Sequence, residues 1–70
     1  MRISARNQLR CTVTKISRGA SIANVELDVG GQRVVASITV EAVDELEIVE
    51  GAEVTAVVKA SDVMIATEPA

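Results

Sequence analysis

The 70-residue sequence has no histidine and no aromatic residue, and it has a single cysteine and a single proline. Without histidine, the chain lacks the side chain most often used for proton transfer near neutral pH. Without aromatic rings, it has no platform on which a nucleobase or a flat organic cofactor could stack. Cys11 cannot form an internal disulfide, and no set of metal ligands is present. These absences argue against an enzyme, an organic cofactor and a structural metal ion.

The apolar residues that are present are small. They make up 49% of the chain and are mainly Val, Ile and Ala. A core built from them has little volume, so a chain of this size gains only a small net stability from its own interior. Disulfides and metals are unavailable, which leaves association as the remaining means of stabilisation. We therefore predict one domain over residues 1–70 that forms a homo-oligomer by sharing apolar strand surface.

Charge and the N-terminal residues limit the possible partners and location. The formal net charge is −3, whereas nucleic-acid affinity depends largely on Lys and Arg neutralising phosphates. The first six residues lead into polar Asn7 and Gln8 rather than into the apolar stretch of a secretory signal. No apolar run approaches the roughly 20 residues of a membrane span. We predict a cytoplasmic protein that binds neither nucleic acid nor a membrane.

β-branched residues and alternating polarity dominate the chain and predict strands. The first strand is expected over Gln8–Ser17, with a β-bulge at Thr14-Lys15 because the alternation slips there. Residues 23–29 alternate cleanly, and Gly30-Gly31 after them predicts a tight hairpin of type I′ or II′. Further strands are expected over residues 34–40, 54–59 and 63–66, with turns at residues 18–21, at Gly51 and at residues 60–62.

A change of period at Thr39 predicts the one helix. Thr39 suits an N-cap, Glu41 lies in the first turn, and Val43 and Leu46 stand three apart, so a short helix is expected over Val40–Leu46. Five strands with a helix between the third and fourth is the order of the OB-fold. An SH3-like barrel would resemble it but normally has no helix there. We predict an all-β, OB-fold-like five-stranded barrel.

Several other side chains fit structural roles. Cys11 lies on the apolar face of the first strand, where a free cysteine behaves as a small hydrophobe. Met64 is expected to pack in the core or in an interface. A solvated helix face is the expected role of the acidic residues Asp44, Glu45, Glu47 and Glu50.

Two short runs of small polar residues, Ser4-Ala5-Arg6-Asn7 and Lys59-Ala60-Ser61, carry the functional signal. Each residue alone fits an ordinary surface position. Together they supply hydroxyl, guanidinium, amide and ammonium donors, and in an OB-like barrel both runs can lie at the same end. Thr39 adds a helix N-terminus with unpaired N–H groups, which a neighbouring subunit could supply. The combination predicts an anion site.

The donor set also limits the anion. All of these groups donate, and neither a histidine nor a carboxylate is placed among them to accept a proton. A fully deprotonated tetrahedral dianion therefore suits the site, whereas hydrogen phosphate would leave its O–H without an acceptor. Sulfate, molybdate and tungstate all satisfy this condition.

Four segments in order resemble the molybdenum-pterin-binding domain family, also called Mop or molbindin: residues 4–9, 36–39, 51–54 and 59–63. The resemblance covers nearly the whole chain. It implies an OB-like fold, assembly of single-domain members as a hexamer built as a trimer of dimers, and binding of molybdate or tungstate at subunit interfaces. It implies no chemistry on the oxyanion.

The resemblance also assigns residues to the oxyanion site: Ser4, Ala5, Arg6, Thr39, Lys59, Ala60 and Ser61. Asn7 and the Gly19-Ala20 turn are further candidates, the turn through its backbone N–H groups in a second class of site. The Arg6 guanidinium either contacts oxygen or braces its segment. Many relatives carry a serine where this sequence has Ala42, so one hydroxyl is missing.

The expected function is storage and homeostasis of molybdate or tungstate without catalysis. The alternative is a structural or regulatory OB-like interaction module whose anion site is vestigial. Binding of oxyanions would distinguish the two.

Overall fold

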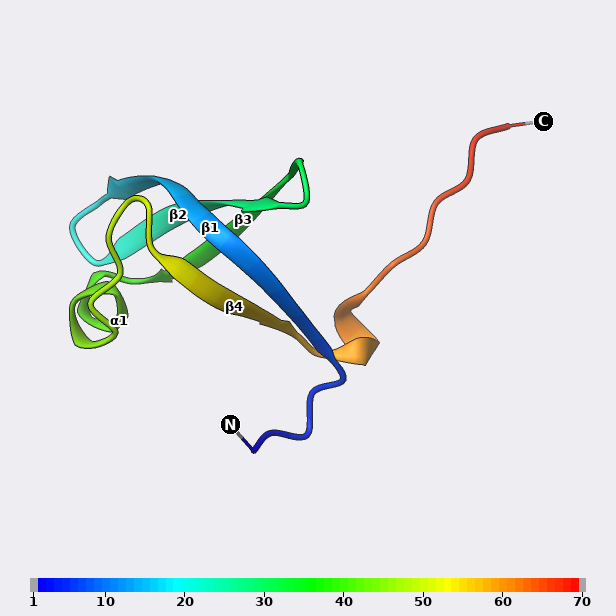
Figure 1. Cartoon of the computed structure of the whole chain (residues 1–70), viewed down its shortest axis with the longest axis horizontal. Helices are drawn as coiled ribbons and strands as arrows, with labels where there is room; N and C mark the ends of the chain where they lie inside the picture. Colours follow the sequence, from blue (N-terminus) through cyan, green and yellow to red (C-terminus); the bar gives the residue numbers. More distant parts are fainter. Residues whose placement is uncertain (1, 70) are drawn as a thin grey trace.

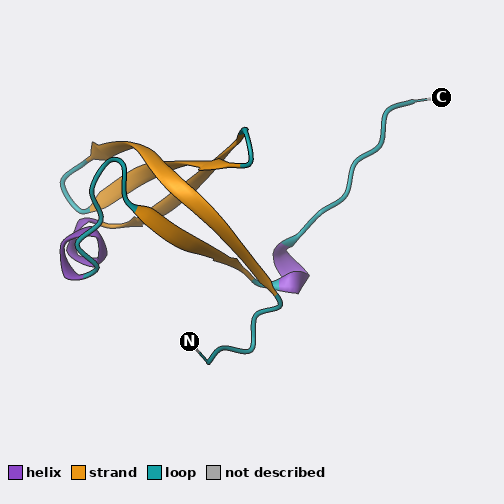
Figure 2. Ribbon diagram, viewed as in Figure 1, coloured by secondary structure: helices purple, strands orange, loops and turns teal. Residues whose placement is uncertain are grey.

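The computed structural model describes residues 2–69, which form one antiparallel sheet and one short α-helix (Figures 1 and 2). The strand order in the sheet is β3-β2-β1-β4. The predicted all-β class, with the helix between the third and fourth strands, is confirmed. In chain order the elements are β1 Asn7–Arg18, β2 Ile22–Val29, β3 Gln32–Thr39, α1 Val40–Glu45, β4 Glu53–Val58 and the 3-10 helix η1 Ala60–Asp62.

Both irregularities predicted for the first three strands are confirmed. The β1–β2 register shifts between Val13 and Lys15, which is the position of the predicted bulge. At the β2–β3 turn, Gly30 has φ 56° and Gly31 has φ 89°, so both central residues take the left-handed conformation of a type I′ hairpin. The bulge and the turn set which side chains of each strand face inward.

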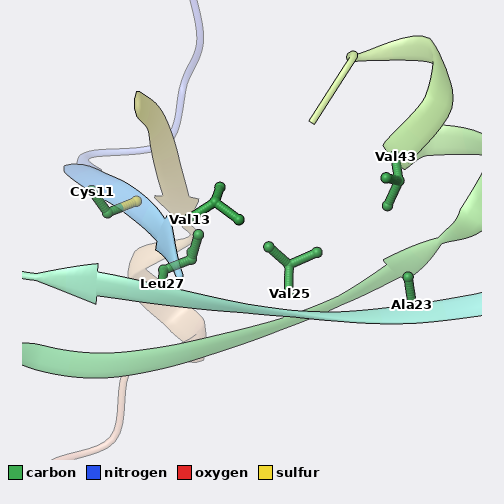
Figure 3. Packing of buried hydrophobic residues seen from close by; sticks show 6 residues of the cluster. All are labelled: Cys11, Val13, Ala23, Val25, Leu27 and Val43. Atoms are coloured by element: carbon green, nitrogen blue, oxygen red, sulfur yellow. The ribbon is translucent and has the colours of Figure 1, made fainter. Parts of the chain in front are cut away.

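The core lies on the concave face of the sheet, under α1 (Figure 3). Ala23, Val25 and Leu27 alternate along β2 and are at most 4% exposed, as their spacing predicted. Cys11 is buried beside them and its thiol donates to the Val54 carbonyl oxygen at 3.5 Å. The remaining buried hydrophobic residues are Val13 and Val43.

Helix α1 begins and ends in recognisable caps. The Thr39 hydroxyl accepts a hydrogen bond from the Ala42 N–H at 3.0 Å, which confirms the predicted N-cap. At the other end, the Ile48 N–H donates to the Val43 carbonyl at 3.0 Å and the Glu47 N–H to the Asp44 carbonyl at 3.1 Å. This is a Schellman motif, and its left-handed position is held by Glu47 with φ 53° rather than by glycine.

Charged side chains occupy the outer surface. The predicted solvated acidic face around α1 is confirmed, since Asp44, Glu45, Glu47 and Glu50 are all exposed. On the sheet, the Arg33 Nε donates to Glu26 Oε1 at 2.7 Å, and this hydrogen bond holds the pKa of the Glu26 carboxyl below its ordinary value. This ion pair joins β2 and β3 and lies apart from the candidate site described below.

The predicted fifth strand is wrong for this chain. Residues 63–69, which we call the arm, form no strand and leave the body beyond η1 (Figure 1). Met64 is 92% exposed and Ile65 is 90% exposed, so Met64 does not pack in the core of its own chain, and its packing in an interface stays a prediction. The residues have strand-like composition, but an extended segment becomes a strand only when another edge supplies hydrogen-bond partners.

The missing strand leaves an open hollow on the inner side of the sheet. It has a volume of about 800 Å³ and lies between β3 and β4, with Leu27 and Val25 among its lining residues. Its lining is largely apolar, and Leu46, which also lines it, is 69% exposed.

None of the helices in residues 2–69 is long and apolar enough to cross a membrane.

Candidate oxyanion site

Pairing of β1 with β4 brings the two donor runs together. Asn7, the first residue of β1, is the register partner of Val58, the last residue of β4. Ser4–Arg6 precedes the first of these residues and Lys59–Ser61 follows the second, so both runs leave the sheet from adjacent points (Figure 1). The sequence-based expectation that the two runs lie at one end of the barrel is met by this geometry.

The η1 turn presents free donors. Its backbone hydrogen bonds run from the Asp62 N–H to the Lys59 carbonyl at 2.9 Å and from the Val63 N–H to the Ala60 carbonyl at 3.3 Å. The N–H groups of Ala60 and Ser61 begin the 3-10 helix, and they have no backbone partner within residues 2–69. Both residues are exposed, as is Lys59.

The N-terminal run is held by one side-chain contact. Gln8 Nε2 donates to the Ala5 carbonyl oxygen at 3.3 Å, which folds the segment back toward the start of β1. Ser4 and Arg6 are exposed and Ala5 is half-buried. Asn7 itself belongs to β1 and pairs in the sheet. The ion pairs among the described residues use Arg10, Arg18 and Arg33, so Arg6 and Lys59 take part in none of them.

Thr39 and the Gly19-Ala20 turn lie at the other end of the sheet. Thr39 ends β3 and pairs with Ile22, next to the turn that follows β1. Strand β1 has 12 residues between the two ends. At roughly 3.3 Å per residue the ends are up to about 36 Å apart. One chain therefore does not bring Thr39 to Lys59, and a site that uses both needs two copies.

The start of α1 offers fewer donors than its position suggested. The Val40 N–H donates to the Ser21 carbonyl at 2.9 Å, and the Ala42 N–H is taken by the Thr39 hydroxyl oxygen. Of the N–H groups expected to be unpaired at this helix end, those of Val40 and Ala42 are therefore not free. The hydroxyl proton of Thr39 is still free to donate, because the oxygen acts as acceptor in the cap.

The Gly19-Ala20 turn is also partly used. The Gly19 N–H donates to the Ile22 carbonyl oxygen at 2.8 Å, so it is not free for an anion. A Cβ on Gly19 would lie 2.9 Å from the same oxygen, which explains why glycine occupies this position. The turn can offer an N–H from Ala20 but not the Gly19 N–H that the sequence suggested.

Replacing Thr39 by alanine should lower the free energy of unfolding by about 1 kcal/mol, because the Ala42 N–H loses its cap. In a chain of this size, that corresponds to a fall of roughly 4–8 °C in the thermal midpoint. Thr39→Ser keeps the hydroxyl and should stay close to the unmodified chain. Equal midpoints for the alanine variant and the unmodified chain would show that the cap contributes no stability.

The described residues hold no cluster of three or more His, Cys, Asp or Glu side chains that could bind a metal ion. None of their polar or charged side chains is buried. The candidate site therefore consists of exposed hydroxyl, ammonium, guanidinium and backbone N–H donors. Such donors bind an anion rather than a cation.

Comparison with known proteins identifies the family. The TOBE domain matches residues 3–65. Molybdenum-pterin-binding protein 2 of Clostridium pasteurianum is 48% identical over 66 residues, which cover 93% of this chain and 97% of the relative. The chain belongs to the TOBE domain family and, within it, to the single-domain molybdenum-pterin-binding proteins, the Mop or molbindin group.

Solved structures agree with the fold. A molybdate-binding protein from Sporomusa ovata has a TM-score of 0.92 and 40% identity, over 96% of this chain and all of that chain. The cytoplasmic molybdate-binding protein ModG, solved with molybdate bound, has a TM-score of 0.81 and 43% identity, over 86% of this chain and 43% of that chain. The OB-fold-like class is confirmed, and the likeness to the Sporomusa protein extends over most of the arm.

The sequence did not reveal the hollow between β3 and β4 or the detached arm. Residues 63–66 have the composition of an ordinary strand, but composition carries no information about whether a free strand edge lies beside the segment. The signal that could have indicated a detached segment is the short turn at residues 60–62. A three-residue turn can direct the following segment either back along β4 or away from it.

Proposed function

We propose that this protein binds molybdate or tungstate reversibly and serves in storage and homeostasis of the oxyanion in the cytoplasm, without catalysis. The observation that carries the proposal is the pairing of Asn7 with Val58, which places Ser4–Arg6 beside Lys59–Ser61. The names of the relatives, molybdenum-pterin-binding and molybdate-binding proteins, support this ligand.

The chemistry of the site supports an unprotonated tetrahedral oxyanion. Lys59 supplies a positive charge, and the N–H groups of Ala60 and Ser61 supply donors in fixed positions. Hydrogen bonds from charged or backbone donors to an anion are among the stronger ones in proteins. The Lys59 ammonium and the backbone N–H groups of Ala60 and Ser61 can only donate, so they favour an oxyanion without a proton over hydrogen phosphate.

The residues present do not suit an organic cofactor or a reaction. The chain has no aromatic ring to stack on a pterin, in spite of the name its relatives carry. It has no histidine, and none of its described carboxylates is buried in a way that would prepare it for proton transfer. Reversible capture by fixed donors requires neither group.

The proposed assembly is a homo-oligomer, a hexamer built as a trimer of dimers, with oxyanions at the subunit interfaces. The small core and the exposed Met64 and Ile65 support association. The position of Thr39 at the opposite end from Lys59 supports sites that combine donors from two copies. Since an oxyanion held between subunits binds only the assembled state, it also stabilises the assembly by mass action.

Isothermal titration with molybdate, tungstate, sulfate and phosphate tests the proposal. We expect saturable heat from molybdate or tungstate and little from phosphate at neutral pH. Absence of heat from all four anions, confirmed by equilibrium dialysis, would contradict the proposal and favour an interaction module with a vestigial site.

A further inference from the structure

Backbone carbonyl groups in both donor runs are already engaged within the chain. In the second run, η1 engages them with backbone groups, since the Asp62 N–H donates to the Lys59 carbonyl at 2.9 Å. In the first run, Gln8 Nε2 donates to the Ala5 carbonyl oxygen at 3.3 Å. Each of these bonds joins a carbonyl to the third residue after it. Both runs therefore turn an acceptor inward and leave N–H groups on the outside.

The two runs reach this arrangement by different means. A backbone bond to the third residue is the defining bond of a 3-10 helix, so η1 needs no side chain for it. Gln8 is part of β1, opposite Val57, and its contact with the Ala5 oxygen is made by the side chain. The Gln8 amide thus takes the place that a backbone N–H has in η1. A side chain without a donor at this position would leave the Ala5 carbonyl free to turn.

The contact at Ala5 also determines the direction of the next N–H group. The Ala5 carbonyl and the Arg6 N–H belong to one planar trans peptide group, in which they point in opposite directions. The Arg6 N–H donates to no backbone oxygen within residues 2–69. With the carbonyl turned toward the Gln8 amide, this N–H points away from it. The first run therefore presents a donor where a rotated peptide group would present an acceptor.

A carbonyl oxygen that faced the anion would change which anion the site prefers. Such an oxygen only accepts, so it repels an oxyanion without a proton and provides an acceptor for the O–H of hydrogen phosphate. The Ser4 hydroxyl beside it both donates and accepts, and it suits either kind of anion. The orientation of the peptide group between Ala5 and Arg6 therefore bears directly on the choice between the two.

We propose that Gln8 is a positioning residue of the oxyanion site, which holds the Ala5 carbonyl away from the anion and directs the Arg6 N–H toward it. This orientation raises the preference for molybdate over hydrogen phosphate. The proposal rests on the function proposed above and assigns Gln8 no contact with the anion. Selectivity at this site then comes from excluding an acceptor as well as from supplying donors.

The variant Gln8→Met tests the proposal, because methionine keeps an unbranched side chain but has no N–H donor. Equilibrium dialysis with labelled molybdate measures the dissociation constant, and phosphate and sulfate are then added as competitors. We expect the molybdate dissociation constant to rise roughly two- to tenfold, the factor that corresponds to one neutral hydrogen bond. Phosphate should compete about threefold better or more, relative to molybdate, than it does with the unmodified protein.

Sulfate separates a change of orientation from a general loosening of the run. Like molybdate, it carries no proton at neutral pH, so an exposed carbonyl weakens the binding of both anions. We expect the ratio of the sulfate and molybdate constants to stay the same in Gln8→Met, while the ratio of the phosphate and molybdate constants falls. A purely structural role of Gln8 would instead raise the constants of all three anions by the same factor.

Gln32→Met is the matched control, since Gln32 is the only other glutamine of the chain. It is exposed, begins β3 and pairs with Val29 beside the hairpin. The same substitution there should leave the constants of all three anions unchanged. Gln8 is exposed as well, so both variants should give the circular-dichroism spectrum of the unmodified protein.

The Arg6 amide proton gives a second measurement that needs no variant. In the unmodified protein, molybdate should shift its resonance downfield, as a new hydrogen bond to an anion does. Saturable molybdate binding that leaves the Arg6 amide resonance in place would show that this N–H does not face the anion.

The outcomes separate this proposal from the proposed function. If the unmodified protein binds molybdate, but phosphate competes no better relative to molybdate in Gln8→Met, the role of Gln8 is wrong and the proposed function stands. If the unmodified protein binds none of the four oxyanions, the proposed function fails and the role of Gln8 fails with it.

Discussion

Replacing Lys59 by alanine is expected to weaken molybdate binding by roughly ten- to hundredfold while leaving the sheet intact. Lys59 directly precedes η1, is exposed, and takes part in none of the ion pairs of residues 2–69. The substitution removes a charge-assisted hydrogen bond to the oxyanion, and such bonds contribute roughly 1.5–3 kcal/mol. At about 1.4 kcal/mol per factor of ten, the loss corresponds to the stated range.

Lys15 provides the control for this variant, since it is the only other lysine of the chain. It is exposed on β1, near the shift in the β1–β2 register and remote from η1. Lys15→Ala removes the same net charge and should leave the affinity unchanged. Titration calorimetry on both variants separates a local contact from a general effect of charge. Equal affinities for Lys59→Ala and Lys15→Ala would show that the ammonium group of Lys59 does not touch the anion.

Replacing Leu27 by alanine is expected to destabilise the fold by about 2–5 kcal/mol. Leu27 is 4% exposed and belongs to the cluster of buried residues on β1 and β2, where it lies beside Val13 (Figure 3). Small domains have a total stability of only about 5 kcal/mol or less. The variant should therefore be largely unfolded at 37 °C, which denaturant titration followed by circular dichroism would measure.

Val49→Ala is the surface comparison, because Val49 is 60% exposed in the loop after α1. Surface truncations of this kind usually change stability by no more than about 0.5 kcal/mol. A small effect at Leu27, similar to that at Val49, would mean that this core does not hold the chain together and that association provides nearly all of the stability.

Local sequence patterns determined most of the sheet. Gly30-Gly31 predicted the hairpin because a type I′ turn needs positive φ at both central residues, and glycine adopts positive φ without steric cost. The slip in alternation near Lys15 predicted the bulge because inward and outward positions must keep their period of two. Thr39 predicted the start of α1 because its hydroxyl can accept a backbone N–H.

Other features depended on partners that sequence does not show. Glu47 ends α1 in a left-handed conformation that glycine usually supplies, so nothing in the residue type marked it. The sequence indicated that the N–H groups of the Gly19 turn and of the helix start could bind an anion. In the structure the Gly19 N–H donates to the Ile22 carbonyl oxygen and the Val40 N–H to the Ser21 carbonyl oxygen. Period and composition predicted a fifth strand in the arm, but they do not show whether the segment finds a free strand edge to pair with.

The sequence also predicted the candidate site only in part, since the residue types were visible in it but their relative positions were not. The structure places Ser4–Arg6 next to Lys59–Ser61 through the register of β1 and β4, and it places Thr39 at the opposite end. Ala42 in the first turn of α1 carries no hydroxyl, and the Thr39 cap supplies one at that helix end.

The most direct test of the account is a molybdate titration of the assembled protein followed by backbone amide chemical shifts. We predict that the largest changes fall on residues 5, 6, 60 and 61, with smaller changes at Thr39, and that they saturate with the dissociation constant from calorimetry. Saturable binding with the largest changes elsewhere, and none at residues 60 and 61, would contradict the proposed site.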